Sequence, residues 1–236
     1  MSLIQEKIAT YSPAQLSIDA VGDSKIVLLV GITGAGKDTI KNALLREDDF
    51  YNFVSYTTRQ PRENKGVLEQ DGREYHFITI DEAMEMLERG EFIEAKEYAG
   101  NIYGTAFEGL QQAVSEGKIA INDVEVQGVE EYKKYIRNAI AVFILPPNFE
   151  EWQRRLQLRY DPEEFRQEWP KRREAAIREL EHALKVPYYH FVINDELDKA
   201  VEATKVIAHN DDMFTRKDDE ARLLARDILD AIRKHV

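Results

Sequence analysis

The chain has 236 residues and carries 32 Lys and Arg against 44 Asp and Glu, which gives a net charge of −12. With 43% hydrophobic and 32% charged residues, and no apolar run near the roughly 20 residues of a membrane span, it has the composition of a globular protein with one sizeable core. It contains no cysteine, which excludes disulfides, cysteine-ligated zinc and thiol catalysis and favours a reducing cytoplasm.

The first half of the chain is predicted to alternate helices with strands. No basic stretch leads into an apolar segment near residue 1, so we expect no secretory signal there. Residues 25–30, KIVLLV, form a continuous apolar run that is typical of a parallel strand buried on both faces. Asp81 is predicted to cap a helix that Gly90 ends. We expect helices at 2–10, 38–47, 81–89 and 106–115, and strands at 53–58, 75–79, 92–97 and 118–123.

The second half continues the same alternation. A long helical region is expected at 150–184, with a break near Asp161 and Pro162. The other expected helices are 129–138, 197–209 and 217–235, and the strands are 139–145 and 190–194. Strands that alternate with helices predict an α/β fold with a mostly parallel sheet.

A glycine-rich loop follows the buried strand at 25–30. Residues 31–39, GITGAGKDT, fit the pattern G-x-x-x-x-G-K between a strand and a helix, the context in which this pattern binds nucleotide phosphates. Glycines let backbone N–H groups converge on a phosphate, the helix N-terminus favours the same anion, and Lys37 adds a full positive charge. Asp38 stands where Ser or Thr usually ligates Mg²⁺; it would hold the metal through water or cap the helix, and Thr39 offers a hydroxyl. The alternative is a glycine-rich turn that only caps a helix.

Several further short motifs follow one another in a defined order along the chain. They are 55–62 (SYTTRQPR), 69–75 (EQDGREY), 92–94 (FIE), 100–105 (GNIYGT), 123–128 (DVEVQG) and 193–199 (INDELDK). Together with the loop at 31–39, this series resembles the guanylate kinases over residues 25–209. The resemblance implies a three-layer P-loop kinase fold with a mostly parallel central sheet, a small β-rich GMP-binding subdomain and a helical lid. It also implies phosphoryl transfer from ATP to GMP, or to dGMP, with Mg²⁺.

The resemblance also implies a division of the chain. The P-loop core would comprise 25–54, 105–150 and 178–209, the GMP-binding subdomain 55–104, and the lid 151–177. Residues 1–24 and 210–236 would be N-terminal and C-terminal extensions.

The family's GMP-binding residues carry over by position. Arg59 and Arg62 would clamp the GMP phosphate, because guanidinium groups bind phosphate oxygens in a bidentate manner, and the hydroxyls of Tyr75 and Tyr103 would assist. Glu94 would accept hydrogen bonds from guanine N1 and N2. The remaining expected pocket residues are Ser55 and Thr105, near O6, and Glu69 and Glu125. The family usually has Asp where Glu125 stands, and the loop at 63–68 is enlarged here.

The ATP side follows from the same resemblance. Lys37 and the lid residues Arg159 and Arg172 would be catalytic, with Arg166 and Arg173 as substitutes if the lid register differs. Thr39 and, through water, Asp123 would hold Mg²⁺. The expected ATP-binding residues are Thr33, Gly34, Ala35, Gly36, Lys37, Asp38, Thr39 and Asn194.

Two alternative functions remain open at this point. One is a kinase for another phosphorylated acceptor on the same scaffold, and the other is a non-catalytic guanylate-kinase-like module that binds proteins. The intact Gly36 and Lys37 disfavour the module, whereas Asp38 favours it. The expected partners are ATP and GMP alone, with no nucleic acid and no membrane, in a cytoplasmic monomer or homodimer.

Overall fold

The structure is a computed structural model that describes residues 2–64, 66–210 and 216–235. Of the predicted C-terminal extension, residues 211–215 and 236 therefore lie outside the described part. The chain divides into two compact units, each of which is described by itself. The first comprises Met1–Lys25, Tyr51–Ala120 and Glu130–Ala139, and the second comprises Ile26–Phe50, Ile121–Val129 and Ile140–Val236.

The larger sheet has five strands in the order β11-β10-β1-β9-β2. The strands are β1 (Lys25–Val30), β2 (Phe50–Asn52), β9 (Ile119–Asp123), β10 (Asn138–Leu145) and β11 (Tyr189–Ile193). β10 and β11 run parallel, from the pair Ala141–Tyr189 to the pair Leu145–Ile193. Residues 26–30 of β1 are at most 1% exposed, which confirms the prediction of a strand buried on both faces.

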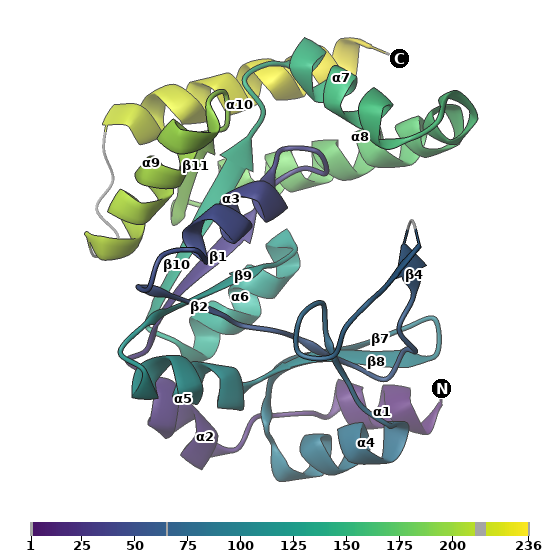
Figure 1. Cartoon of the computed structure of the whole chain (residues 1–236), viewed down its shortest axis with the longest axis vertical. Helices are drawn as coiled ribbons and strands as arrows, with labels where there is room; N and C mark the ends of the chain where they lie inside the picture. Colours follow the sequence, from purple (N-terminus) through teal and green to yellow (C-terminus); the bar gives the residue numbers. More distant parts are fainter. Residues whose placement is uncertain (1, 65, 211–215, 236) are drawn as a thin grey trace. The chain divides into compact units, whose positions relative to one another are not determined.

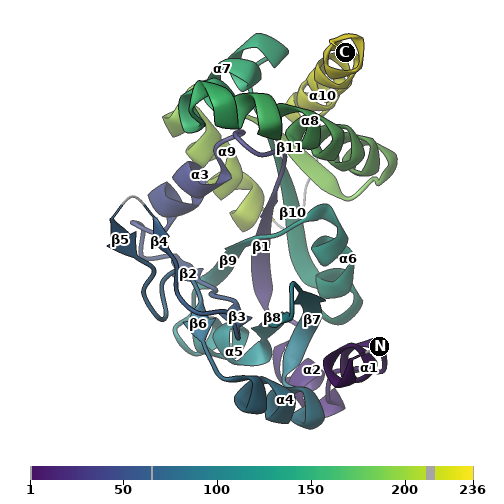
Figure 2. The ribbon, with the colours of Figure 1, turned by 90° about the vertical axis from the view of Figure 1, so that its right-hand side faces the viewer.

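Helices cover this sheet. α3 (Lys37–Leu44) and α9 (Leu197–His209) lie on one side of β1 and β10, and α10 (Arg216–Lys234) lies on the other (Figure 2). α10 packs on β11, on α7 (Phe149–Arg159) and on α8 (Pro162–Lys185).

The predicted break in the long helical region is confirmed, because Asp161 caps α8 and Pro162 occupies its first turn. The structure also contains α5 (Phe107–Ser115) and α6 (Val126–Tyr135). The helix predicted at 129–138 spans 126–135 instead, because Asn138 already begins β10.

The first unit holds a four-stranded sheet in the order β6-β3-β8-β7. Its strands are β6 (His76–Phe77), β3 (Tyr56–Thr57), β8 (Asn101–Ala106) and β7 (Phe92–Tyr98). Beside it, β4 (Glu63–Asn64) and β5 (Val67–Leu68) form a hairpin in the enlarged loop, and α2 spans Gln15–Val21. α4 (Ile80–Arg89) and α1 (Leu3–Ala9) pack beneath β7 and β8 (Figure 1).

Two local predictions in the first unit have different outcomes. Gly90 ends α4 in the left-handed conformation, with φ of 66°, as predicted. The cap predicted at Asp81 was wrong. Thr79 is the N-cap. Its hydroxyl accepts a hydrogen bond from the Glu82 backbone N–H, and the Glu82 carboxylate accepts one from the Thr79 backbone N–H.

Candidate active site

The loop between β1 and α3 is held in place from several sides within the second unit. The Trp152 indole donates to the Thr33 carbonyl at 2.8 Å, and Lys37 Nζ donates to the Gly31 carbonyl at 2.5 Å. Gly36 adopts φ of +97°, and a Cβ there would lie 2.2 Å from Asn194 Nδ2. Both the backbone conformation and the close approach of Asn194 therefore require glycine at this position.

A cavity of about 580 Å³ opens over this loop in the second unit. Its lining includes Lys37, the two predicted lid arginines Arg159 and Arg172, and one further arginine, Arg155. The other lining residues are Thr33, Gly34, Gly36, Asp38, Thr39, Asp123, Asn194, Asp195 and Leu197. Four cationic side chains around the N-terminus of α3 make this cavity suitable for a polyphosphate.

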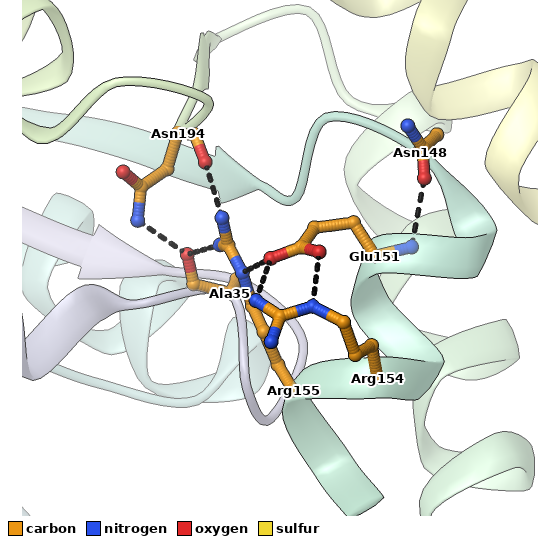
Figure 3. Close-up of polar contacts among 6 residues, drawn as sticks. All are labelled: Ala35, Asn148, Glu151, Arg154, Arg155 and Asn194. Carbon is orange, nitrogen blue, oxygen red and sulfur yellow. Dashed lines mark hydrogen bonds and ion pairs between the residues drawn. The ribbon is translucent and has the colours of Figure 1, made fainter. Parts of the chain in front are cut away.

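Arg155 is a site residue to which the sequence analysis gave no role. Its guanidinium donates to the Asn194 carbonyl at 2.9 Å and to the Ala35 carbonyl at 3.4 Å (Figure 3). Glu151 orients it by accepting from both Arg154 and Arg155, and these ion pairs lower the pKa of Glu151 to about 2. The helical spacing of Arg155 and Arg159, one turn apart on α7, was the signal that would have found it.

Asn194 is buried and ties the end of β11 to the glycine-rich loop. Its side-chain amide donates to the Ala35 carbonyl at 2.8 Å, and its backbone N–H donates to the Leu145 carbonyl. The same residue lines the cavity, where the sequence analysis expected it to contact adenine. Asn194 thus has a positioning role toward the loop in addition to the predicted contact.

Two acidic residues lie near the loop, and they have different surroundings. Asp38 is exposed in the first turn of α3, whose N-cap is Gly36, so Asp38 is not the cap. Asp123, at the end of β9, is ion-paired with Lys41 of α3. Among residues 2–64, 66–210 and 216–235 there is no group of three or more acidic or histidine side chains able to hold a metal without other ligands.

In the first unit, Arg59 is the centre of a polar and aromatic cluster. It forms a two-pronged ion pair with Glu69, with N–O distances of 2.8 and 3.2 Å, and both side chains are about nine-tenths buried. The ion pair raises the pKa of Arg59 and lowers the pKa of Glu69. The Tyr75 ring lies 5.4 Å from the Arg59 guanidinium and 6.0 Å from the Tyr103 ring. Glu69 also accepts from the Arg62 backbone N–H, so it orders both predicted phosphate-binding arginines.

A second group of polar side chains, linked by hydrogen bonds, lies on the same sheet. The Thr105 hydroxyl donates to Glu94 Oε1 at 3.0 Å, and it lies 3.1 Å from the Ser55 hydroxyl. Thr105 and Tyr103 are two residues apart on β8 and therefore share one face of the sheet. Tyr103, predicted to contact the phosphate, and Thr105, predicted to contact the base, thus lie on the same face of this sheet.

Comparisons with known proteins identify the family of this chain. The family profile described as guanylate kinase matches residues 23–210. The chain belongs to the guanylate kinase family. Guanylate kinase of Paraburkholderia xenovorans is 38% identical over 177 residues, which is 75% of each chain, and that of Trichormus variabilis is 35% identical over 77% of this chain and 88% of its own. The crystal structure of guanylate kinase from Anaplasma phagocytophilum matches with a TM-score of 0.58 and 25% identity, over 86% of this chain and 96% of that one.

The family resemblance and the fold class expected from the sequence are thereby confirmed. Residues 1–22 and 211–236 lie outside the family match. Of the eight GMP-binding positions expected in the segment 55–105, all belong to the first unit, whereas Glu125 and the expected ATP and metal residues belong to the second.

The arginines predicted to belong to a lid in this guanylate kinase family member have different partners. Arg172 is ion-paired with Glu168 at 2.8 Å and lies 5.9 Å from the Tyr160 ring. Arg173 turns to the C-terminus of α10, where it donates to the Ile232 and Arg233 carbonyls. Arg159 and Arg172 thus line the cavity together with Lys37, whereas Arg173 serves as a cap for α10.

Glu179 of α8 is a second residue without a role in the sequence analysis. Burial raises the pKa of its carboxyl group to about 7, and the nearby Glu125 carboxylate adds to the shift. Burial also lowers the pKa of Lys37, while the charges of Glu179 and Asp123 oppose that effect. The Glu179 carboxyl group thus interacts electrostatically with Lys37, and about half of it is protonated near pH 7.

This shift makes stability depend on pH. Between pH 4.5 and 7 the folded state holds a proton on Glu179 that the unfolded state has released, so the stability contributed by this group falls as pH rises and levels off above pH 7. We expect Glu179→Gln to stabilise the protein by about 1–3 kcal/mol at pH 8 and to have little effect near pH 4.5. Urea unfolding from pH 4.5 to 8 measures the difference. Glu174→Gln, at a carboxyl group 75% exposed on the same helix, is the matched control, and parallel pH profiles for wild type and Glu179→Gln would contradict the assignment.

Proposed function

We propose that this protein transfers the γ-phosphoryl group of ATP to GMP and yields ADP and GDP. The observation that carries the proposal is the cavity in which Lys37 of the glycine-rich loop meets Arg155, Arg159 and Arg172. Phosphoryl transfer needs little covalent chemistry from the protein. It needs positioning, exclusion of water and stabilisation of the charge that moves with the phosphoryl group, and four cations around one loop serve these needs.

We assign the acceptor GMP to the first unit. Glu94 would accept from guanine N1–H and the N2 amino group, a pair of donors that adenine lacks, while Thr105 and Ser55 would meet the base edge near O6. Arg59 and Arg62, with Tyr75 and Tyr103, would bind the phosphate. An oxygen of the GMP phosphate is already an anion at neutral pH, so the reaction needs no general base.

The residues around the loop fit Mg²⁺. Thr39, Asp38 and Asp123 line the same cavity as Lys37, and Mg²⁺ bound with a nucleotide usually takes few protein ligands and keeps several waters. Thr39 and, through water, Asp123 would hold the ion, with Asp38 as a further water-mediated partner. The bound ion would neutralise charge on the β and γ oxygens of ATP. The ion pair with Lys41 of α3 restrains the Asp123 carboxylate beside the cavity.

The cellular setting of this reaction is also a proposal. Every helix among the described residues is too short or too polar to cross a bilayer. We propose a cytoplasmic location, which is supported by the absence of cysteine and by the expected need for ATP and GMP.

A coupled assay for ADP formation tests the proposed function. The protein is incubated with ATP and Mg²⁺, and GMP, dGMP, AMP, UMP and CMP are supplied separately. We expect fast turnover with GMP, or with GMP and dGMP, and only low activity with the other three. Binding of GMP without turnover of any acceptor would overturn the kinase assignment in favour of a binding module, and Asp38→Ser would then test whether this departure from the family abolished the activity.

A further inference from the structure

Residues 2–22 lie outside the family match, yet they are built into the first unit. α1 packs against β7 and α4, as Figure 1 shows. Ile4, Ile8 and Tyr11 pack against a buried cluster that includes Phe92, the first residue of β7. The N-terminal segment therefore contacts the strand that carries Glu94.

β7 contains an irregularity immediately before Glu94. Phe92 is paired with Ala106 and Glu94 with Thr105, so two steps along β7 match one step along β8 and Ile93 is the extra residue of a β-bulge. Phe92 and Ile93 are both at most 1% exposed, although neighbouring residues in a regular strand point to opposite faces. The bulge resets the alternation, and Glu94 emerges opposite Thr105, within hydrogen-bond distance of its hydroxyl.

Tyr11 is attached at this bulge. Its hydroxyl donates to the Phe92 carbonyl at 2.5 Å, across 81 positions of sequence. The Tyr11 phenol is a donor at neutral pH, and burial raises its pKa further.

The neighbouring backbone is clamped as well. The Ala14 N–H donates to the Gly90 carbonyl at 3.0 Å. A Cβ at Gly90 would lie 2.4 Å from the Ala14 nitrogen, so the two segments touch at backbone distance. Residues 11–14 thus lie directly along residues 90–92, on the N-terminal side of the bulge.

We propose that Tyr11 is a positioning residue for guanine recognition, because its hydrogen bond to the Phe92 carbonyl holds the bulge that directs Glu94 toward Thr105. This inference rests on the proposed function, in which Glu94 binds the base. It assigns to the N-terminal segment a part in acceptor specificity, exerted through the backbone of β7.

Tyr11→Phe tests the inference, because it keeps the packed ring and removes only the hydroxyl. We expect the KM for GMP to rise roughly five-fold, with a similar fall in the GMP to AMP ratio of kcat/KM, since the carboxylate loses part of its fixed orientation. The KM for ATP and kcat at saturating GMP should stay within about two-fold. A general loss of stability would not separate the two substrates in this way.

Two controls isolate the bulge. Lys7→Met removes the ion pair between α1 and Glu88 of α4, so it loosens the same helix without touching Phe92. Ser115→Ala removes a hydroxyl that donates to the backbone carbonyl of Gln112, at the end of α5. Both variants should keep the wild-type KM for GMP and the wild-type preference for GMP over AMP.

Calorimetric titration with GMP, run on the same proteins, separates this inference from the proposed function. If wild type turns over or binds GMP and Tyr11→Phe matches it in KM, Kd and selectivity, the positioning role is overturned while the function stands. An equal effect of Lys7→Met would also overturn it, because docking of α1 in general would then explain the result. A wild-type protein that neither binds nor phosphorylates GMP would overturn both.

Discussion

Lys37→Ala is expected to lower kcat for GMP phosphorylation by about 100- to 1,000-fold. Lys37 is the loop cation expected nearest the β and γ oxygens of ATP, and its ammonium group is held at the Gly31 carbonyl beside the cavity. Because it is already positioned and largely desolvated, its charge acts on the transferred phosphoryl group without reorganisation. Steady-state kinetics with ATP, Mg²⁺ and GMP measure the loss.

Two further variants interpret that result. Lys37→Arg keeps the charge but replaces a compact ammonium with a larger planar group, so it should recover only a small part of the activity. Lys199→Ala removes a lysine that is 76% exposed on α9 and should retain wild-type kcat. Wild-type turnover in Lys37→Ala would contradict the assignment of the glycine-rich loop to the catalytic site.

Glu94→Gln is expected to reduce kcat/KM for GMP by about 10- to 100-fold, while the low activity with AMP changes little. The Thr105 hydroxyl donates to Glu94 Oε1, so a glutamine would keep its oxygen on that side. Its NH₂ group would then point at guanine N1–H and N2–H, and a donor would face donors. The preference for GMP over AMP should therefore fall with the loss of GMP activity.

The measurement is kcat/KM for GMP and for AMP in wild type and variant. Glu85→Gln, at a carboxyl group 67% exposed on α4 of the same unit, is the matched control and should leave both values unchanged. If Glu94→Gln retained the wild-type ratio between the two acceptors, another group would have to read the base, and Glu94 would be left with a structural bond to Thr105.

Features that depend on neighbours in the sequence were predicted well. The apolar run of β1 is buried on both faces, and the helix break at Asp161 and Pro162 occurs where a capping residue is followed by proline. The glycine-rich loop lies between a strand and a helix, and Lys37 lines a cavity above it. In each case the spacing of residue types within a few turns of chain specifies the local backbone.

The ends of helices were predicted less well, because they depend on which of several possible caps or strand partners forms in the folded chain. Asp81 and Thr79 are both good caps, and the reciprocal bond with Glu82 selects Thr79. α6 ends at Tyr135 because residues from Asn138 onward pair in the central sheet. A cap or a strand partner several residues away changes where a helix can begin or end, although the helix itself was predictable.

The sequence by itself thus determined the fold class and the family, because these follow from local pattern and ordered motifs. The loop, lid and base-contacting residues that it assigns stay predictions. Only the tertiary structure decided how side chains distant along the chain meet. It brings Arg155 to the backbone of Ala35 and Asn194, raises the pKa of Glu179 by burial beside Glu125, and sets Tyr11 against the bulge before Glu94. Burial, electrostatic environment and long-range hydrogen bonds depend on which surfaces pack together, and no pattern of neighbouring residues specifies that.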